Sequence, residues 1–231
     1  GITVVEMIFL RIAGMETFGS ICHAFTTMPT GGFSTKNASI AHYDNPMIHY
    51  IIIFFMFLAG INFSLHFHAM SGSIKTYFRD TEFLVYFSII FLVSSIILFS
   101  LSYQSNTFSD LTIRESLFGT VAMLTGTGYT LGDYELWPVF LQMILLTLMF
   151  IGGMGGSTTG GMKVMRVLLL VKYAALETRR MLHSRALLPV KIGKQLIKED
   201  VVRNTLGFFL FFMSAFIISA ILLSTMGLDM E

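Results

Sequence analysis

The sequence predicts an all-α integral membrane protein built from tandem repeats of two spans joined by a short loop, with one helix broken inside the membrane. Three observations lead to this fold class. Hydrophobic residues make up 54% of the 231 residues and charged residues only 13%, about half the charged fraction of a soluble domain. A short helix followed by a Thr/Gly sequence occurs twice. A glycine-rich stretch interrupts one of the most apolar segments.

The apolar segments set the number of spanning helices. A helix needs about 20 residues to cross a bilayer, and residues 47–67, 83–101 and 206–226 have this length and character. Pro46 marks a helix start before the first of them. We expect residues 2–14 to be the end of a truncated span. We therefore expect three complete spans and one partial span, in addition to the broken helix.

Two segments, residues 18–28 and 113–124, are too short and too polar to cross a bilayer. Each leads into a Thr/Gly sequence, TTMPTGGFST in the first case and MLTGTGYTLG in the second. The two align at a spacing of 96 residues, which pairs Ser20 with Ser116, Gly32 with Gly128, Phe33 with Tyr129, and Ser34 with Thr130. Because the flanking spans follow in the same order, we predict an internal repeat.

Charged residues predict the orientation. Lysines and arginines concentrate in the loop with Lys75 and Arg79 and in the connection at residues 172–203, whereas acidic residues lie beside the Thr/Gly sequences. Basic loops of membrane proteins face the cytoplasm. We therefore expect a multi-pass protein of the cell (inner) membrane, with basic loops inside and both Thr/Gly sequences open to the outside.

The two Thr/Gly sequences predict re-entrant loops that bind a monovalent cation. Irregular backbone at membrane depth is tolerated where it lines a watery path, and glycine lets carbonyl oxygens face an ion and replace its water shell. The negative C-terminal end of each short helix also favours a cation. The alternative is a pair of extracellular turns with incidental glycines. The candidate ion-binding residues are the first glycine loop, Thr30, Gly31, Gly32 and Phe33, and the second glycine loop, Gly126, Thr127, Gly128 and Tyr129.

Residues 139–173 form the broken helix, which as one piece would be about 50 Å long against a hydrocarbon core of about 30 Å. Its glycines each cost about 1 kcal/mol in a helix, so we expect an intramembrane gating loop below the glycine loops and a helix that resumes near Met162. The alternatives are GxxxG helix packing and, for Lys163, a side chain that simply reaches the cytoplasmic interface. The candidate gating residues are Gly152, Gly153, Gly155, Gly156, Ser157, Thr158, Thr159, Gly160, Gly161 and Lys163.

Three sequences carry a resemblance to a known family: SICHAFTTMPTGGFST, LTGTGYTLGD and IGGMGGSTTGGMKVMRVLLLVK. They are similar to the Trk/Ktr/HKT superfamily of potassium transporters, most closely to TrkH/TrkG-like membrane subunits. Such proteins contain four span–pore-loop–span units of the potassium-channel type around one pore. The resemblance implies that this partial chain lacks the first and fourth pore loops. It further implies four regions: residues 1–67 as the second unit with a truncated first span, 81–173 as the third unit with the gating loop, 174–200 as a basic cytoplasmic connection, and 201–231 as the first span of the fourth unit.

The resemblance also implies a function. The protein would take up K⁺ as the ion-conducting subunit, with K⁺ bound by backbone carbonyls of a selectivity filter and no covalent cofactor. Gly32 and Gly128 match the filter glycines, although neither loop reads TVGYG. A homodimer and a cytosolic nucleotide-binding regulatory subunit of the TrkA/KtrA type are the implied partners. Residues 179–198 are either a docking surface for that subunit or ordinary cytoplasmic positive charge.

The alternative function is a Na⁺- or H⁺-coupled secondary cation transporter with a midplane site at the broken helix. An enzyme is not expected, because the sequence contains no nucleophile–base pair and no cluster of metal ligands. Nucleic-acid binding is not expected either, because no basic patch is interleaved with aromatic residues.

Overall fold

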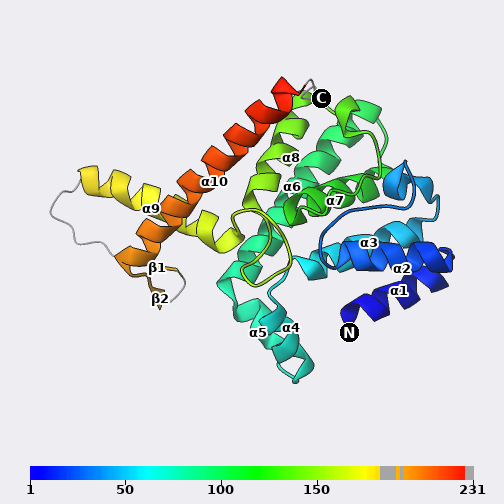
Figure 1. The fold of residues 1–231 in the computed structure, drawn as a ribbon, viewed down its shortest axis with the longest axis horizontal. Coiled ribbons are helices and arrows are strands. Elements are labelled where there is room, and N and C mark those ends of the chain that lie inside the picture. The colour runs from blue at the N-terminus through cyan, green and yellow to red at the C-terminus, as the bar shows by residue number, and fades with distance from the viewer. Residues whose placement is uncertain (183–190, 193–194, 227–231) are drawn as a thin grey trace. The chain divides into compact units, whose positions relative to one another are not determined.

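The computed structural model describes residues 1–182, 191–192 and 195–226, and the chain divides into two compact units, Gly1–Val164 and Met165–Glu231. Helices dominate both units (Figure 1), which confirms the predicted all-α class. The finer division into four regions stays a prediction. The first unit contains α1 (Ile2–Ile12), α2 (Thr17–Thr27), the short turn η1 (Ser39–His42), α3 (Pro46–Ala59), α4 (Phe63–Met70), α5 (Lys75–Arg79), α6 (Thr81–Ser105), α7 (Asp110–Thr125), the turn η2 (Tyr134–Leu136) and α8 (Val139–Ile151). The second contains most of α9 (Val164–Leu182), β1 (Lys191–Ile192), β2 (Gln195–Leu196) and α10 (Glu199–Thr225).

Two helices among the described residues are long and apolar enough to cross a membrane alone, one over Thr81–Gln104 and one over Glu199–Thr225. They correspond to the spans predicted at residues 83–101 and 206–226. α10 begins earlier than predicted because Glu199 and Asp200 occupy its first turn, where acidic side chains interact favourably with the helix N-terminus. The membrane class of the protein therefore follows from both sequence and structure.

The predicted short helices are present as α2 and α7. The Ser109 hydroxyl caps α7 by accepting a hydrogen bond from the backbone N–H of Thr112 at 3.2 Å. α7 ends at Thr125. The next residue, Gly126, has a left-handed φ of 69°, which stops the helix where the second glycine loop begins.

Residues 47–67, predicted as one complete span, form two helices rather than one. α3 and α4 are separate helices that bend by 102° at the break between them. Gly60 lies so close to the Tyr86 ring that a Cβ would overlap the tyrosine hydroxyl. The Asn62 side chain starts α4 by accepting a hydrogen bond from the Ser64 backbone N–H at 2.8 Å. Counted as one broken span, this pair would be the third crossing.

α7 lies at the centre of the first unit and packs against α3, α6 and α8 (Figure 1). Its side chains are polar for a buried helix, and Ser116, Thr120 and Thr125 each donate a hydroxyl hydrogen bond to the carbonyl four residues earlier. Pairing of this kind is what buried polar groups require. The helix that leads into the second glycine loop is therefore enclosed on several sides.

The second unit has a small core of its own. Leu169 of α9, Ile192 of β1 and Val202 of α10 are buried together. β1 and β2 pair antiparallel and form the one hairpin in the described residues, a minor feature that was not predicted. α9 continues to Leu182, so the segment predicted as a basic connection, residues 174–200, begins as helix.

Candidate functional site

The first glycine loop follows the C-terminal end of α2. The backbone N–H groups of Thr30 and Gly32 donate to the carbonyls of Thr27 (2.9 Å) and Thr26 (3.2 Å). Both loop residues adopt positive φ, 56° for Thr30 and 68° for Gly32. Glycine adopts this left-handed conformation readily and other residues rarely do, so the loop depends on glycine at residue 32.

The second glycine loop repeats these contacts 96 residues later in the chain. The N–H groups of Gly126 and Gly128 donate to the carbonyls of Met123 and Ala122, both at 3.2 Å. The φ angles of the two glycines are 69° and 74°. Each contact has its counterpart in the first glycine loop, so the internal repeat exists in the backbone as well as in the sequence.

The two glycine loops touch each other. A Cβ at Gly32 would overlap the carbonyl oxygen of Thr127, and the Tyr129 hydroxyl lies 2.6 Å from the Thr26 hydroxyl at the end of α2. Tyr129 is 0% exposed, whereas Phe33, its counterpart in the repeat, is 78% exposed. The two aromatic residues therefore differ in role: the tyrosine hydroxyl finds partners inside the unit, and phenylalanine has no polar group that could do so.

The 152–163 loop, defined as residues 152–163 between α8 and α9, contains no helix, as predicted. Gly152 and Gly161 at its two ends have φ angles of 78° and 74°. A Cβ at Gly161 would lie 2.8 Å from the Gly152 Cα, so the ends meet at a distance that only glycine permits. The Lys163 ammonium donates to carbonyl and hydroxyl oxygens of Ser157 and Thr159. These bonds connect the end of the loop to its middle.

The 152–163 loop also pairs with the break between α3 and α4. The Met154 N–H donates to the Gly60 carbonyl at 2.9 Å, and the Phe63 N–H donates to the Gly156 carbonyl at 3.1 Å. Two interruptions that are distant in sequence thus satisfy each other's backbone groups. This pairing explains how both breaks persist in an apolar part of the chain, where unpaired backbone groups cost several kcal/mol.

Finally, the 152–163 loop lies against both glycine loops. The Thr158 hydroxyl donates to the Met28 carbonyl at 2.8 Å, and the Thr30 hydroxyl donates to the Thr158 carbonyl at 3.2 Å. On the other side, a Cβ at Gly126 would lie 3.9 Å from the Gly160 nitrogen. The structure therefore brings the three predicted segments together in one place.

The oxygen atoms of this region suit an alkali cation better than a transition metal. Backbone carbonyls and threonine hydroxyls are hard, mostly neutral donors. Among the described residues, no group of three or more His, Cys, Asp or Glu side chains lies close enough to hold a metal ion.

Comparison with known proteins decides the family. The family model described as "TrkH: Cation transport protein" matches residues 2–231. The chain belongs to the TrkH family. It is 38% identical over 231 residues to the Trk system potassium uptake protein TrkH of Escherichia coli (strain K12), covering 99% of this chain and 48% of that protein. It is 34% identical over 222 residues to the TrkG protein of the same strain, covering 95% of this chain and 45% of that protein.

A solved structure agrees with this TrkH-family membership. The crystal structure of the potassium transporter TrkH from Vibrio parahaemolyticus matches with a TM-score of 0.92 and 35% identity, over 98% of this chain and 49% of that one. The chain thus spans about half the length of the relatives it matches. The resemblance drawn from the sequence motifs is confirmed, and a family of cation transport proteins agrees with the prediction that the protein is not an enzyme.

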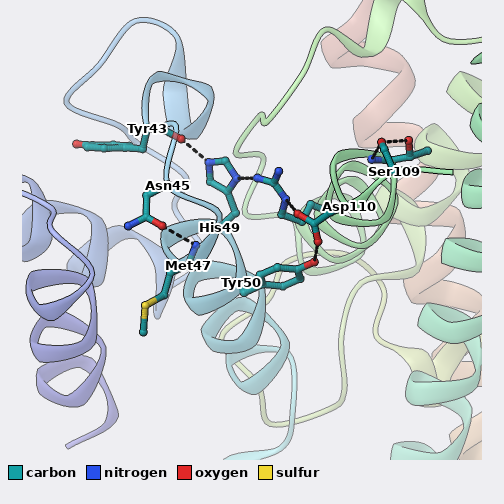
Figure 2. A network of polar contacts seen from close by, with 9 residues as sticks. Tyr43, Asn45, Met47, His49, Tyr50, Ser109 and Asp110 are labelled. Atoms are coloured by element: carbon teal, nitrogen blue, oxygen red, sulfur yellow. Dashed lines mark hydrogen bonds and ion pairs between the residues drawn. The ribbon is translucent and has the colours of Figure 1, made fainter. Parts of the chain in front are cut away.

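A polar network of the TrkH-family chain was not predicted from the sequence (Figure 2). His49 and Tyr50 of α3 contact Arg114 and Asp110 at the start of α7. In the sequence, Asp110 is only one of the acidic residues beside a Thr/Gly sequence. The i,i+4 spacing of Asp110 and Arg114 is typical of an ion pair on one helix face. The contact with His49 could not be predicted in this way, because His49 lies 65 residues from Arg114.

Two buried carboxyl groups were also missed. Glu82 accepts a hydrogen bond from the Gly155 N–H in the 152–163 loop at 2.7 Å. Glu6 of α1 is 0% exposed, and neither of its carboxyl oxygens has a hydrogen-bond partner among the described residues. The available signal for Glu6 was its position inside the apolar run ITVVEMIFL, since an ionisable residue at membrane depth is a functional candidate by default.

Proposed function

We propose that this chain is part of the ion-conducting subunit of a Trk-type potassium uptake system. Its relatives carry the name potassium uptake protein, and K⁺ is the permeating ion of the proposal. The observation that carries it is the meeting of the two glycine loops, each at the end of a short helix and each with at least one left-handed glycine. In this proposal the loops supply two segments of a selectivity filter, whose backbone carbonyls replace the water shell of K⁺.

The 152–163 loop is the proposed gate. Its contacts with Met28, Thr30 and the α3–α4 break hold it directly against the glycine loops, where it would obstruct a passing ion. The Lys163 ammonium binds oxygens of Ser157 and Thr159 in the same loop, which holds the loop in its closed form. Movement of α9 would then shift the loop and open the path.

The alternative, a Na⁺- or H⁺-coupled transporter with a midplane site at the broken helix, is less well supported. Such a site needs free oxygen atoms for the coupling cation. In the 152–163 loop, oxygens of Ser157 and Thr159 already accept hydrogen bonds from Lys163. The loop therefore binds its own cation, which favours a barrier over a coupling site.

Orientation and partners complete the proposal. Basic loops face the cytoplasm and the glycine loops face the outside of the inner membrane. The subunit forms a homodimer and is controlled by a cytosolic nucleotide-binding regulatory subunit of the TrkA/KtrA type. The surface proposed for that subunit, residues 179–198, lies partly outside the described residues, which omit 183–190 and 193–194.

A serine at residue 128 tests the filter assignment. Gly128 has a φ of 74°, and nothing lies within 4 Å of the position that a Cβ would take, so serine fits but is strained by about 1–3 kcal/mol. We expect Gly128→Ser in the full-length protein to lower the K⁺ to Na⁺ uptake ratio about fivefold or more, because 1.4 kcal/mol corresponds to tenfold. Rubidium and sodium uptake into transporter-deficient cells would measure the ratio.

Gly72→Ser is the matched control for this variant. Gly72 also has positive φ, 93°, and open space around it, but it lies in the turn after α4, away from the glycine loops. It should leave the K⁺ to Na⁺ ratio unchanged. An unchanged ratio in a well-expressed Gly128→Ser protein would rule out residues 126–129 as part of the filter.

A further inference from the structure

A network of hydrogen bonds, which we name the α3–α7 clasp, joins His49 and Tyr50 of α3 to Asp110 and Arg114 of α7 (Figure 2). His49 Nδ1 lies 2.7 Å from Arg114 Nη1. Arg114 Nε donates to Asp110 Oδ2 at 2.8 Å, and the Tyr50 hydroxyl donates to Asp110 Oδ1 at 2.8 Å. His49 and Arg114 are only 4% and 9% exposed, so water does not replace these contacts readily.

The partners of His49 determine which of its nitrogens carries the proton. Nε2 lies 2.6 Å from the carbonyl oxygen of Tyr43, which can only accept a hydrogen bond. Nδ1 faces the Arg114 guanidinium, which can only donate. The imidazole must therefore be neutral, with its hydrogen on Nε2 and a lone pair on Nδ1. A second proton on Nδ1 would point at the guanidinium, break the bond to Arg114 and place two positive charges in contact.

The clasp holds the outer end of the helix that carries the second glycine loop. α7 runs from Asp110 to Thr125, and Gly126 follows directly. Over these 16 residues the helix is about 24 Å long and packs as one rigid element against α3, α6 and α8. A change in how residues 110 and 114 are held therefore shifts or tilts the helix at the end where the loop begins.

We propose that His49 is an acid-sensitive positioning residue: its protonation releases Arg114, loosens the α3–α7 clasp and thereby lowers the K⁺ to Na⁺ selectivity set by the second glycine loop. The inference rests on the proposed function. Free histidine takes up a proton near pH 6.5, but burial of His49 and its contact with Arg114 disfavour the charged ring. The clasp is therefore intact at neutral pH and weakens only at a pH clearly below 6.5.

Some of the other groups that face His49 favour protonation of its imidazole, and others disfavour it. The carboxylates of Asp44, in the turn before α3, and Asp110 of α7 attract a protonated imidazole, whereas Arg114 repels it. The carbonyl of Tyr43 accepts from Nε2, and the carbonyl of Ile40 also favours the protonated ring. Arg114 decides the outcome because it is the charged group in direct contact with Nδ1. The hydrogen bond from Tyr50 keeps the pKa of Asp110 below its usual range, so the Asp110 contacts persist when His49 is protonated.

The test compares His49→Gln with the wild-type full-length protein in liposomes at pH 7.5 and 4.5. Glutamine can donate its amide to Tyr43 and accept from Arg114 with its oxygen, but it cannot be protonated. We expect the wild-type K⁺ to Na⁺ flux ratio to fall about tenfold between the two pH values, the effect of losing one charge-assisted hydrogen bond. His49→Gln should keep the neutral-pH ratio at both values. His68→Gln is the control, because His68 is exposed, and it should behave like wild type.

A second readout separates failure of this inference from failure of the proposed function. The unfolding temperature of the detergent-purified protein needs no transport, and acidification should lower it by about 2–4 °C more in wild type than in His49→Gln. If acidification changes the flux ratio and the unfolding temperature equally in wild type and in His49→Gln, the clasp is not an acid sensor, even if K⁺ uptake is normal. Absence of K⁺ flux together with the expected temperature shift would contradict the proposed function and leave the clasp standing.

Discussion

Replacing Gly32 with alanine is expected to lower K⁺ uptake by the full-length protein at least about tenfold. The new Cβ would overlap the backbone carbonyl oxygen of Thr127 in the second glycine loop, and backbone cannot move aside as a flexible side chain can. The φ of 68° adds strain, about 1–3 kcal/mol for a residue other than glycine, which corresponds to about a 5- to 140-fold loss of correctly ordered loop. Rubidium uptake at a fixed level of membrane expression is the measurement.

The neighbouring glycine provides a matched control. Gly31 does not have positive φ, and the nearest atom to its Cβ position lies at 3.6 Å, an ordinary contact. Gly31→Ala keeps the backbone carbonyl that is proposed to bind K⁺ and displaces no neighbouring atom, so it should retain uptake within about twofold of wild type. Equal uptake by the Gly31→Ala and Gly32→Ala proteins would show that contact between the two glycine loops is irrelevant to transport.

Replacing Gly161 with alanine is expected to open the 152–163 loop. Its Cβ would lie 2.8 Å from the Cα and 2.9 Å from the nitrogen of Gly152, and its φ is 74°. The two ends of the loop must then separate, which destabilises the closed arrangement by about 1–3 kcal/mol or more. Flux without the regulatory subunit should rise about tenfold, measured in liposomes that contain only the membrane subunit. Shortening the loop should act in the same direction.

Gly160→Ala is the control for the loop. It stands next to Gly161, yet nothing lies within 4 Å of its Cβ position and its φ is not positive, so closed-state flux should stay at the wild-type level. The opposite result for Gly161→Ala, a monodisperse protein with wild-type flux, would show that the 152–163 loop does not block the path.

The features that sequence could predict are those encoded by neighbouring residues. Apolar runs predicted α6 and α10, the repeated Thr/Gly sequences predicted α2 and α7 with their loops, and the glycines of residues 152–161 predicted the end of α8. Each of these signals is local, because helix propensity and the residues that end helices or form turns act over a few positions. The 96-residue repeat strengthened them by showing the same local signal twice.

The features that sequence missed depend on partners far along the chain. Residues 47–67 look like one span because a single Gly60 between apolar residues does not normally end a helix. The break exists because the Met154 N–H pairs with the Gly60 carbonyl and the Gly156 carbonyl pairs with the Phe63 N–H. His49 is likewise inconspicuous until α7 brings Arg114 to it. No periodicity or spacing in the sequence reports such tertiary contacts.

The most direct test of the central claim, selective K⁺ passage through the glycine loops behind a gating loop, is ion flux through the full-length protein in liposomes. The concentrations of Na⁺ and the proton gradient should be varied independently while K⁺ flux is measured. We predict flux that follows the electrochemical gradient of K⁺ alone, persists without Na⁺ or a proton gradient, and exceeds Na⁺ flux. Flux that requires an inward Na⁺ or proton gradient would contradict the account and favour a coupled transporter.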